Sequence, residues 1–130
     1  MWLSLIENPE VIQNVFFENP PNLQNVYWKD LQITNGQEIH CKLSFDIWEI
    51  PEKFPEKWVK KNVNTIQISM TLTETEILLL DLSNSFPNGI LNIELTGQYK
   101  KVVFNSGGKD IFILKSKWVY VESVIGYMRE

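Results

Sequence analysis

The stretch from Trp48 to Leu72 constrains the fold of this chain more than any other segment. Its first part contains Pro51 and Pro55, which lack a backbone N–H donor and push the preceding residue into an extended conformation. We therefore expect this part to form neither a helix nor a paired strand. The second part alternates, with Ile66, Ile68, Met70 and Leu72 on one face and Gln67, Ser69 and Thr71 on the other. This alternation predicts a strand, and the stiff proline segment is expected to carry Trp58 onto the edge or end of a sheet.

A helix is predicted near the N-terminus. Asn8 suits the cap position, Pro9 the first helical position, and Glu10 the positive end of the helix dipole. One apolar stripe follows at helical spacing, formed by Val11, Ile12, Val15 and Phe16. The two prolines at 20–21 end the helix, and the apolar residues at 2–6 are expected to add a helical turn on the same core.

The rest of the chain predicts strands with short connections. Asn35-Gly36 and residues 106–109 indicate hairpin turns, and a change of parity across Lys29-Asp30 indicates a bulge. Glu74-Thr75-Glu76 is interpreted as a turn, and residues 77–82, apolar on both faces, as a strand covered on both sides. No helical segment separates consecutive strands, so the sheet is expected to be antiparallel.

The 130 residues fit one domain, spanning residues 1–130. The predicted fold class is α+β. It consists of an N-terminal helix packed on a curved, mainly antiparallel sheet of about seven or eight strands. Two strands without a polar face need cover on both sides, which the helix and the curvature of the sheet are expected to supply.

Composition and charge limit both the class of partner and the cellular compartment. The net charge of −4 argues against binding to nucleic acid. The single cysteine excludes an internal disulfide and fits a reducing compartment. No apolar run exceeds four residues, and the N-terminus lacks a basic region, so neither a membrane span nor a secretory signal is expected. The sequence therefore predicts a soluble, acidic, cytoplasmic protein without a membrane partner.

Catalytic and metal-binding chemistry has little support in the sequence. His40 is the only histidine and Cys41 the only cysteine. Successive side chains of a strand point to opposite faces, so these two neighbours cannot form a nucleophile–base pair. We expect His40 on the wet face of a strand over residues 39–47 and Cys41 in the core. Zinc needs three or four ligands, mostly nitrogen or sulfur. One histidine and one cysteine are too few for such a site. We therefore predict that the chain is not an enzyme and that it has no catalytic residue, metal or cofactor.

Charge and aromatic side chains indicate a binding surface instead. Residues 1–50 hold two lysines against seven acidic residues, whereas residues 98–118 hold five lysines against one aspartate. One interpretation is that the two segments form two solvent-exposed faces of the protein. The alternative is an acidic patch that steers a basic partner toward the binding surface. Trp48 and Trp58 bracket the proline segment. Exposed tryptophan surrounded by charge is typical of the anchors that protein interfaces use.

Four segments together resemble a known family. They are the N-terminal MW-x-L…ENPE helix, the alternating strand that ends in FDI, the PEKFPEKW segment followed by NTIQISMTL, and the late KWVYVESV strand. Their order resembles the bacterial immunity proteins catalogued as immunity protein 50, over most of the chain. The resemblance implies an α+β cytoplasmic protein, encoded beside toxins of polymorphic toxin systems, that binds and neutralises a cognate toxin domain. It implies no catalytic residues.

The hypothesis for the binding site combines the charge and aromatic pattern with the family resemblance. Acidic groups of the first half form part of the toxin-facing surface, and Trp48 or Trp58 is the apolar anchor. The candidate partner-binding residues are Glu38, Asp46, Trp48, Glu49, Glu52 and Trp58. The alternatives are a small-molecule-binding β-roll with an aromatic-lined cavity and a hydrolase that uses His40. An unpaired strand edge also leaves a homodimer open.

Overall fold

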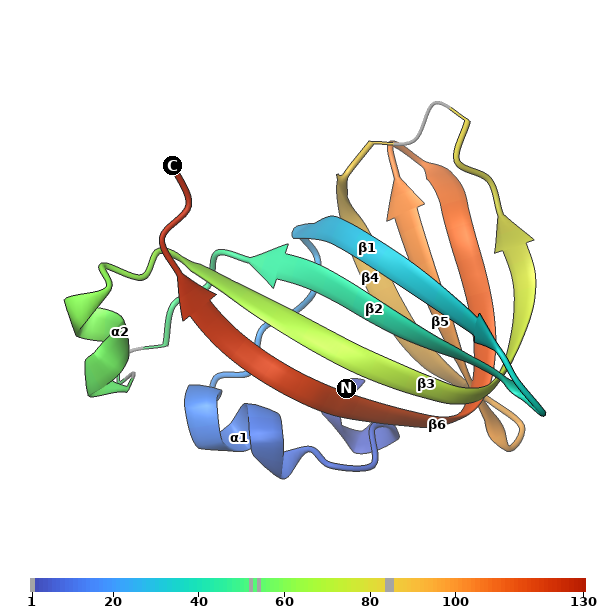
Figure 1. The fold of residues 1–130 in the computed structure, drawn as a ribbon, viewed down its shortest axis with the longest axis horizontal. Helices are drawn as coiled ribbons and strands as arrows, with labels where there is room; N and C mark the ends of the chain where they lie inside the picture. Colours follow the sequence, from blue (N-terminus) through green and yellow to red (C-terminus); the bar gives the residue numbers. More distant parts are fainter. Residues whose placement is uncertain (1, 52, 54, 84–85) are drawn as a thin grey trace.

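The computed structural model describes residues 2–51, 53, 55–83 and 86–130 (Figure 1). The described chain begins with a 3₁₀ turn and a short helix and continues mainly as strands. In order, the elements are η1 (Trp2–Leu5), α1 (Glu10–Phe16), β1 (Val26–Asn35), β2 (Ile39–Ile47), α2 (Glu56–Lys60), β3 (Thr65–Leu80), β4 (Asn88–Thr96), β5 (Tyr99–Ser106) and β6 (Lys109–Tyr127). All strand pairs that the structure describes are antiparallel, which confirms the predicted sheet type.

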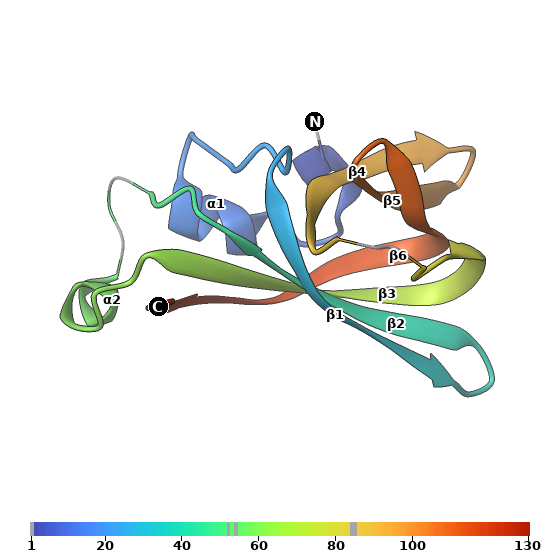
Figure 2. The ribbon, with the colours of Figure 1, turned by 90° about the horizontal axis from the view of Figure 1, so that it is seen from above.

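Two meanders, β1-β2-β3 and β4-β5-β6, make up the sheet and are joined by the pairing of β3 with β6. Figure 2 shows that β4, β5 and α1 lie on the same side of the long strands. The sheet closes into a barrel where β1 meets β4. Among the described residues this seam consists of two residue pairs, Val26 with Gly89 and Tyr27 with Asn88. The sheet is therefore not only curved, as predicted, but closed into a barrel.

The described sheet has six strands rather than seven or eight, because β3 continues where a turn was expected. Glu74 takes a left-handed φ of 48°, yet pairing with β6 goes on past it. Thr75 is buried, with its hydroxyl oxygen 2.7 Å from Ser116 Oγ, and it donates to the Leu72 carbonyl at 3.1 Å. These partners satisfy the hydroxyl inside the sheet, so a polar tripeptide did not mark a turn.

The apolar side chains at the end of β3 are more exposed to solvent than the sequence predicted. Leu78 and Leu80 are exposed, and so is Leu82 beyond the strand, whereas Ile77 and Leu79 are half-buried. The prediction of a strand covered on both sides is therefore wrong for residues 77–82. An apolar run on a strand is buried on both faces when a second layer covers each of them.

The N-terminal segment is tied to β6. Asn8 was predicted to cap α1, but Pro9 occupies that position and the Asn8 side chain pairs with the backbone of Val121. Asn8 Nδ2 donates to the Val121 carbonyl at 2.7 Å, and the Val121 amide donates to Asn8 Oδ1 at 2.8 Å. Trp2, Ile12 and Phe16 are buried in the core, as their apolar pattern predicted.

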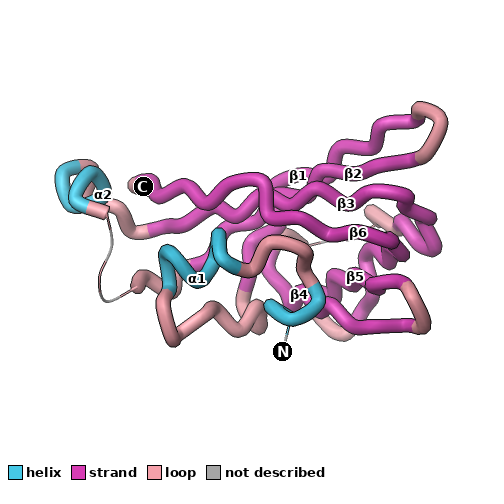
Figure 3. Tube along the Cα trace, turned by 90° about the horizontal axis from the view of Figure 1, so that it is seen from below, coloured by secondary structure: helices cyan, strands magenta, loops and turns pink. Residues whose placement is uncertain are grey.

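The proline segment departs from its prediction in one respect. A short helix, α2, follows Pro55 directly, although neither helix nor strand was expected there. Pro55 itself keeps an extended backbone at the cap, so the helix begins only after the last proline. Trp58 of α2 packs on Gly126 near the end of β6, where an added Cβ would lie 2.7 Å from the indole ring. This confirms that Trp58 anchors on the end of a sheet, and Figure 3 shows α2 beside the C-terminus.

The predicted hairpins and bulge are present. Asn35 pairs with Ile39 across the first hairpin. Gly107 and Gly108 form the last turn with φ values of 62° and 81°. The register of β1 and β2 shifts between Trp28 and Asp30, at the predicted bulge.

Candidate functional site

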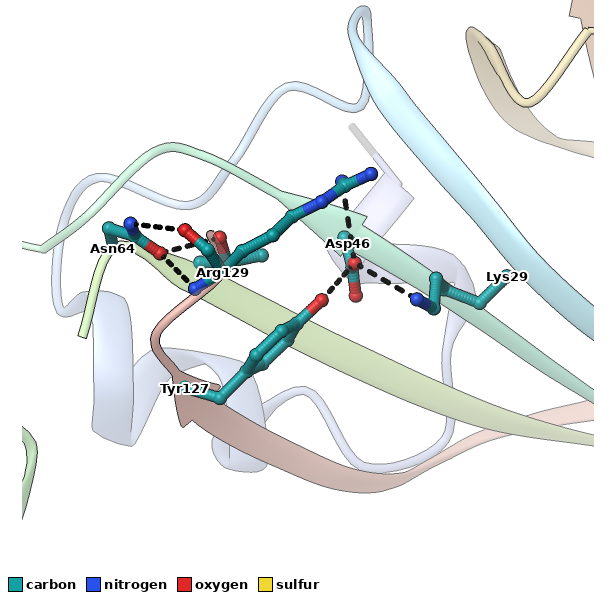
Figure 4. A network of polar contacts seen from close by, with 6 residues as sticks. Lys29, Asp46, Asn64, Tyr127 and Arg129 are labelled. Carbon is teal, nitrogen blue, oxygen red and sulfur yellow. Dashed lines mark hydrogen bonds and ion pairs between the residues drawn. The ribbon is translucent and has the colours of Figure 1, made fainter. Parts of the chain in front are cut away.

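A network of polar contacts converges on Asp46, the second-to-last residue of β2 (Figure 4). The Asp46 side chain is fully buried, and its Oδ2 accepts a hydrogen bond from the hydroxyl of Tyr127 on β6. The same oxygen lies 4.0 Å from Lys29 Nζ and 3.8 Å from Arg129 Nη1. One carboxylate therefore joins β1, β2, β6 and the segment after β6.

The burial of Asp46 corrects the sequence prediction, which placed this residue on the wet face of its strand. Alternation put Ser44 and Asp46 on the polar face, yet both are buried. Ser44 Oγ lies 2.9 Å from Ser69 Oγ of the neighbouring strand. Figure 4 shows Tyr127 and Arg129 reaching over this face toward Asp46. The cover comes from the C-terminal end of the chain, so the second half of β2 has no wet face there.

The network is built from one negative charge and strong donors. Burial, together with the hydrogen bond to Asp46, raises the pKa of Tyr127 to about 12, so the phenol stays a neutral donor at physiological pH. Asp46 Oδ1 has no hydrogen-bond partner among the described residues. Burying a charge is costly unless hydrogen-bonding and charged partners offset that cost, as Tyr127, Lys29 and Arg129 do here. We therefore interpret Asp46 as a residue that positions its neighbours.

Arg129, the only arginine of the chain, carries this network to the surface. Its guanidinium lies 4.1 Å from the centre of the Tyr27 ring and 5.8 Å from that of Trp48. The two rings meet edge to face with centroids 6.4 Å apart, and Trp48 is 38% exposed. We call Tyr27, Trp48 and Arg129 the Trp48 patch. With Asn25 and Asn88 these residues line an open hollow of about 560 Å³.

The backbone of Arg129 is held as firmly as its side chain. Asn64 Oδ1 accepts a hydrogen bond from the Arg129 amide at 2.8 Å, and Asn64 Nδ2 donates to the Arg129 carbonyl at 3.0 Å. The residue is thus fixed at both ends, by Asn64 and by Asp46. A guanidinium held against two rings gains cation–π attraction and loses little further freedom when a partner binds.

The structure brings some of the predicted site residues together and separates others. Asp46, Trp48 and Glu49 lie at one end of β2, while Glu38 lies on the turn at its other end. The nine-residue strand between them spans roughly 30 Å. Trp58 is buried, so Trp48 is the exposed one of the two predicted anchors. Glu52 lies outside the described residues.

The lysines of residues 98–118 are largely paired with acidic residues. Lys100 Nζ lies 2.8 Å from Glu7 Oε1, and Lys109 Nζ lies 3.1 Å from Asp81 Oδ2. Two longer pairs join Lys101 to Glu94 and Lys117 to Glu74, each at 3.8 Å. The positive segment of the sequence is therefore largely neutralised in space.

Two residues considered for catalysis lie as predicted. His40 is exposed, and Cys41 is fully buried on the opposite face. Burial raises the pKa of the Cys41 thiol, although a hydrogen bond with Thr75 opposes this shift. The described residues contain no group of three or more potential ligands placed to hold a metal ion.

The comparisons with known proteins give one match. A family model described as Immunity protein 50 matches residues 8–127, nearly the whole chain. Neither a curated protein nor a solved structure matches. Each helix in the described part of the chain is too short or too polar to span a bilayer.

Proposed function

This chain belongs to the immunity protein 50 family, and we propose that it binds and neutralises a cognate bacterial toxin domain by direct protein–protein contact. The family match, which extends from residue 8 to residue 127, carries this proposal. In the proposed role the protein acts without catalysis, in the cytoplasm, where it meets the toxin that it neutralises.

The Trp48 patch supports a protein partner. Tryptophan, tyrosine and arginine are the residues that most often dominate the binding energy of protein interfaces. Here one residue of each type meets at a single hollow, with the Arg129 guanidinium near both rings. Asp46 and Asn64 hold Arg129 in place before binding, so less conformational freedom is lost when the toxin docks. We propose that the Trp48 patch is part of the toxin-binding surface.

The small-molecule alternative has less support. Aromatic side chains inside the sheet pack on one another: Phe104 and Phe112 stack at 5.6 Å, and the Trp28 ring lies 5.3 Å from that of Phe112. Phe104 and Phe112 are fully buried. Where the structure describes them, these rings contribute to a packed core. We therefore do not propose the ligand-binding function.

The test uses the C-terminal domain of the protein encoded directly upstream of this chain. We expect the two proteins to co-purify, to bind one to one with a Kd of about 10 nM or tighter in calorimetry, and co-expression to abolish the toxicity of that domain. Binding without protection of the cells, or no binding at all, would contradict the proposed function. Light scattering of the free protein checks the separate prediction of a homodimer.

A further inference from the structure

A groove lies between the end of α1 and the residues that follow β2, next to the Trp48 patch. It has a volume of about 600 Å³. Its lining includes Phe16, Phe17 and Glu18 from the α1 side, and Glu49, Ile50 and Lys53 from the other. Glu49 directly follows Trp48, so the groove and the Trp48 patch meet along the chain.

Half of the described lining residues of the groove are apolar, and the groove is open to solvent. Phe17 is 58% exposed and Ile50 is 36% exposed, while Phe16 is buried at the end of α1. Phe17 has a φ of 54° and a ψ of −117°, a strained conformation for a residue with a Cβ. Strained residues gather at binding and active sites, and an exposed aromatic ring gains little packing in return.

The lining of the groove also includes two acidic side chains. Glu18 and Glu49 are both exposed, and neither forms a salt bridge with another described residue. Lys53 is the one cation among the described lining residues. Two carboxylates that lack a salt bridge to any described residue, beside apolar side chains of the groove, therefore favour an occupant that carries positive charge. The chain as a whole, with a net charge of −4, also attracts a basic partner.

We propose that this groove binds a basic segment of the cognate toxin. An apolar side chain of that segment packs between Phe17 and Ile50, and a neighbouring lysine or arginine pairs with Glu18 and Glu49. The inference rests on the proposed function and names the chemistry of the toxin surface that meets this part of the chain.

The experiment measures binding of the upstream-encoded toxin domain by calorimetry to wild type and to two groove variants, Phe17→Ala and E18K/E49K. Each has a matched control elsewhere: Phe86→Ala removes a ring that is 64% exposed, and E76K/E94K reverses two exposed charges on β3 and β4. Circular dichroism confirms that all variants are folded. We expect each groove variant to bind about tenfold more weakly, with both controls within about twofold of wild type.

The dependence of binding on salt concentration distinguishes the charged contacts of the groove from its apolar contacts. Raising the ionic strength from about 50 mM to about 500 mM is expected to reduce the difference between wild type and E18K/E49K, but not the loss caused by Phe17→Ala.

The outcomes distinguish the inference from the function beneath it. If wild type binds and both groove variants bind equally well, the groove is not the site and the proposed function stands. If E76K/E94K weakens binding as much as E18K/E49K does, general charge steering explains the effect and the inference about the groove is wrong. If wild type is a dimer that the groove variants dissociate, the occupant is a second copy, and the inference is wrong. If the wild-type protein does not bind the toxin domain, both the inference and the proposed function are wrong.

Discussion

The hydroxyl of Tyr127 donates a hydrogen bond to the carboxylate of Asp46, 81 positions earlier in the sequence. Tyr127 pairs with Thr65 of β3, and Asp46 pairs with Gln67 of the same strand. The bond therefore passes across β3 and links β6 directly to β2. Because Asp46 is fully buried, this link depends on a charge that water does not solvate.

Replacement of Asp46 tests how much this network stabilises the fold. Asp46→Asn keeps the shape of the side chain but removes the charge that Lys29 and Arg129 approach. We expect the free energy of unfolding to fall by about 2 kcal/mol, the usual scale for a charged hydrogen bond. The exposed Asp30→Asn on β1 is the control and should change it by less than about 0.5 kcal/mol. Urea denaturation measures both, and equal effects would contradict the buried network.

The raised pKa of Tyr127 predicts how stability depends on alkaline pH. In the folded protein the pKa is about 12, against an ordinary value of 10.0. Between these values the unfolded chain has released the phenolic proton while the folded protein keeps it. Stability from this group is therefore complete below pH 10 and is lost as the pH rises toward 12. The variant Tyr127→Phe should lack this loss, which urea unfolding across the same pH range measures; parallel curves would refute the shift.

Two tryptophans of similar exposure allow a matched test of the Trp48 patch. Trp48 is 38% exposed and Trp118 is 40% exposed, on β6. We expect Trp48→Ala to weaken toxin binding by about 2 kcal/mol, because an anchoring ring at an interface is lost. Trp118→Ala should cost less than about 0.5 kcal/mol. Calorimetry gives both values, and the reverse order would move the binding surface to the face of Trp118 and Tyr120.

The contact between Gly126 and Trp58 predicts a position where alanine is not tolerated. A Cβ at Gly126 would lie 2.7 Å from the Trp58 ring and 2.9 Å from Val63 Cγ1. We expect Gly126→Ala to destabilise the fold by about 1–3 kcal/mol through overpacking. Gly36→Ala is the control, because the nearest atom to its added Cβ is 3.7 Å away. Thermal unfolding compares the two, and the additional replacement Trp58→Leu should recover part of the loss.

Sequence patterns predicted the centre of this fold well. β2 and β3 alternate in composition because each buries one apolar face, and they pair in register from Cys41 with Leu72 to Ile47 with Ile66. The same alternation placed Asp46 on a wet face, which was wrong. What covers Asp46 lies at the C-terminal end of the chain, and no local pattern reports a contact over that separation.

The candidate site was predictable to a similar extent. Trp48 and Trp58 were the two candidate anchors beside the prolines, and the structure leaves Trp48 exposed but buries Trp58. Tyr27 and Arg129 were missed, because they reach Trp48 only when the closing strand and the C-terminal end meet beside β2. The one available signal was composition, since Arg129 is the sole arginine and arginine is enriched at interfaces.

The seam between β1 and β4 has a consequence for motion. Tyr27 and Asn88 form one of the two residue pairs described at this seam, and both also line the hollow of the Trp48 patch. A toxin bound in this hollow, as proposed, would touch β1 and the start of β4 at once and would slow their transient separation. The amide of Trp28, which donates to the Pro87 carbonyl across this seam at 2.8 Å, should then exchange its hydrogen more slowly in the complex than in the free protein.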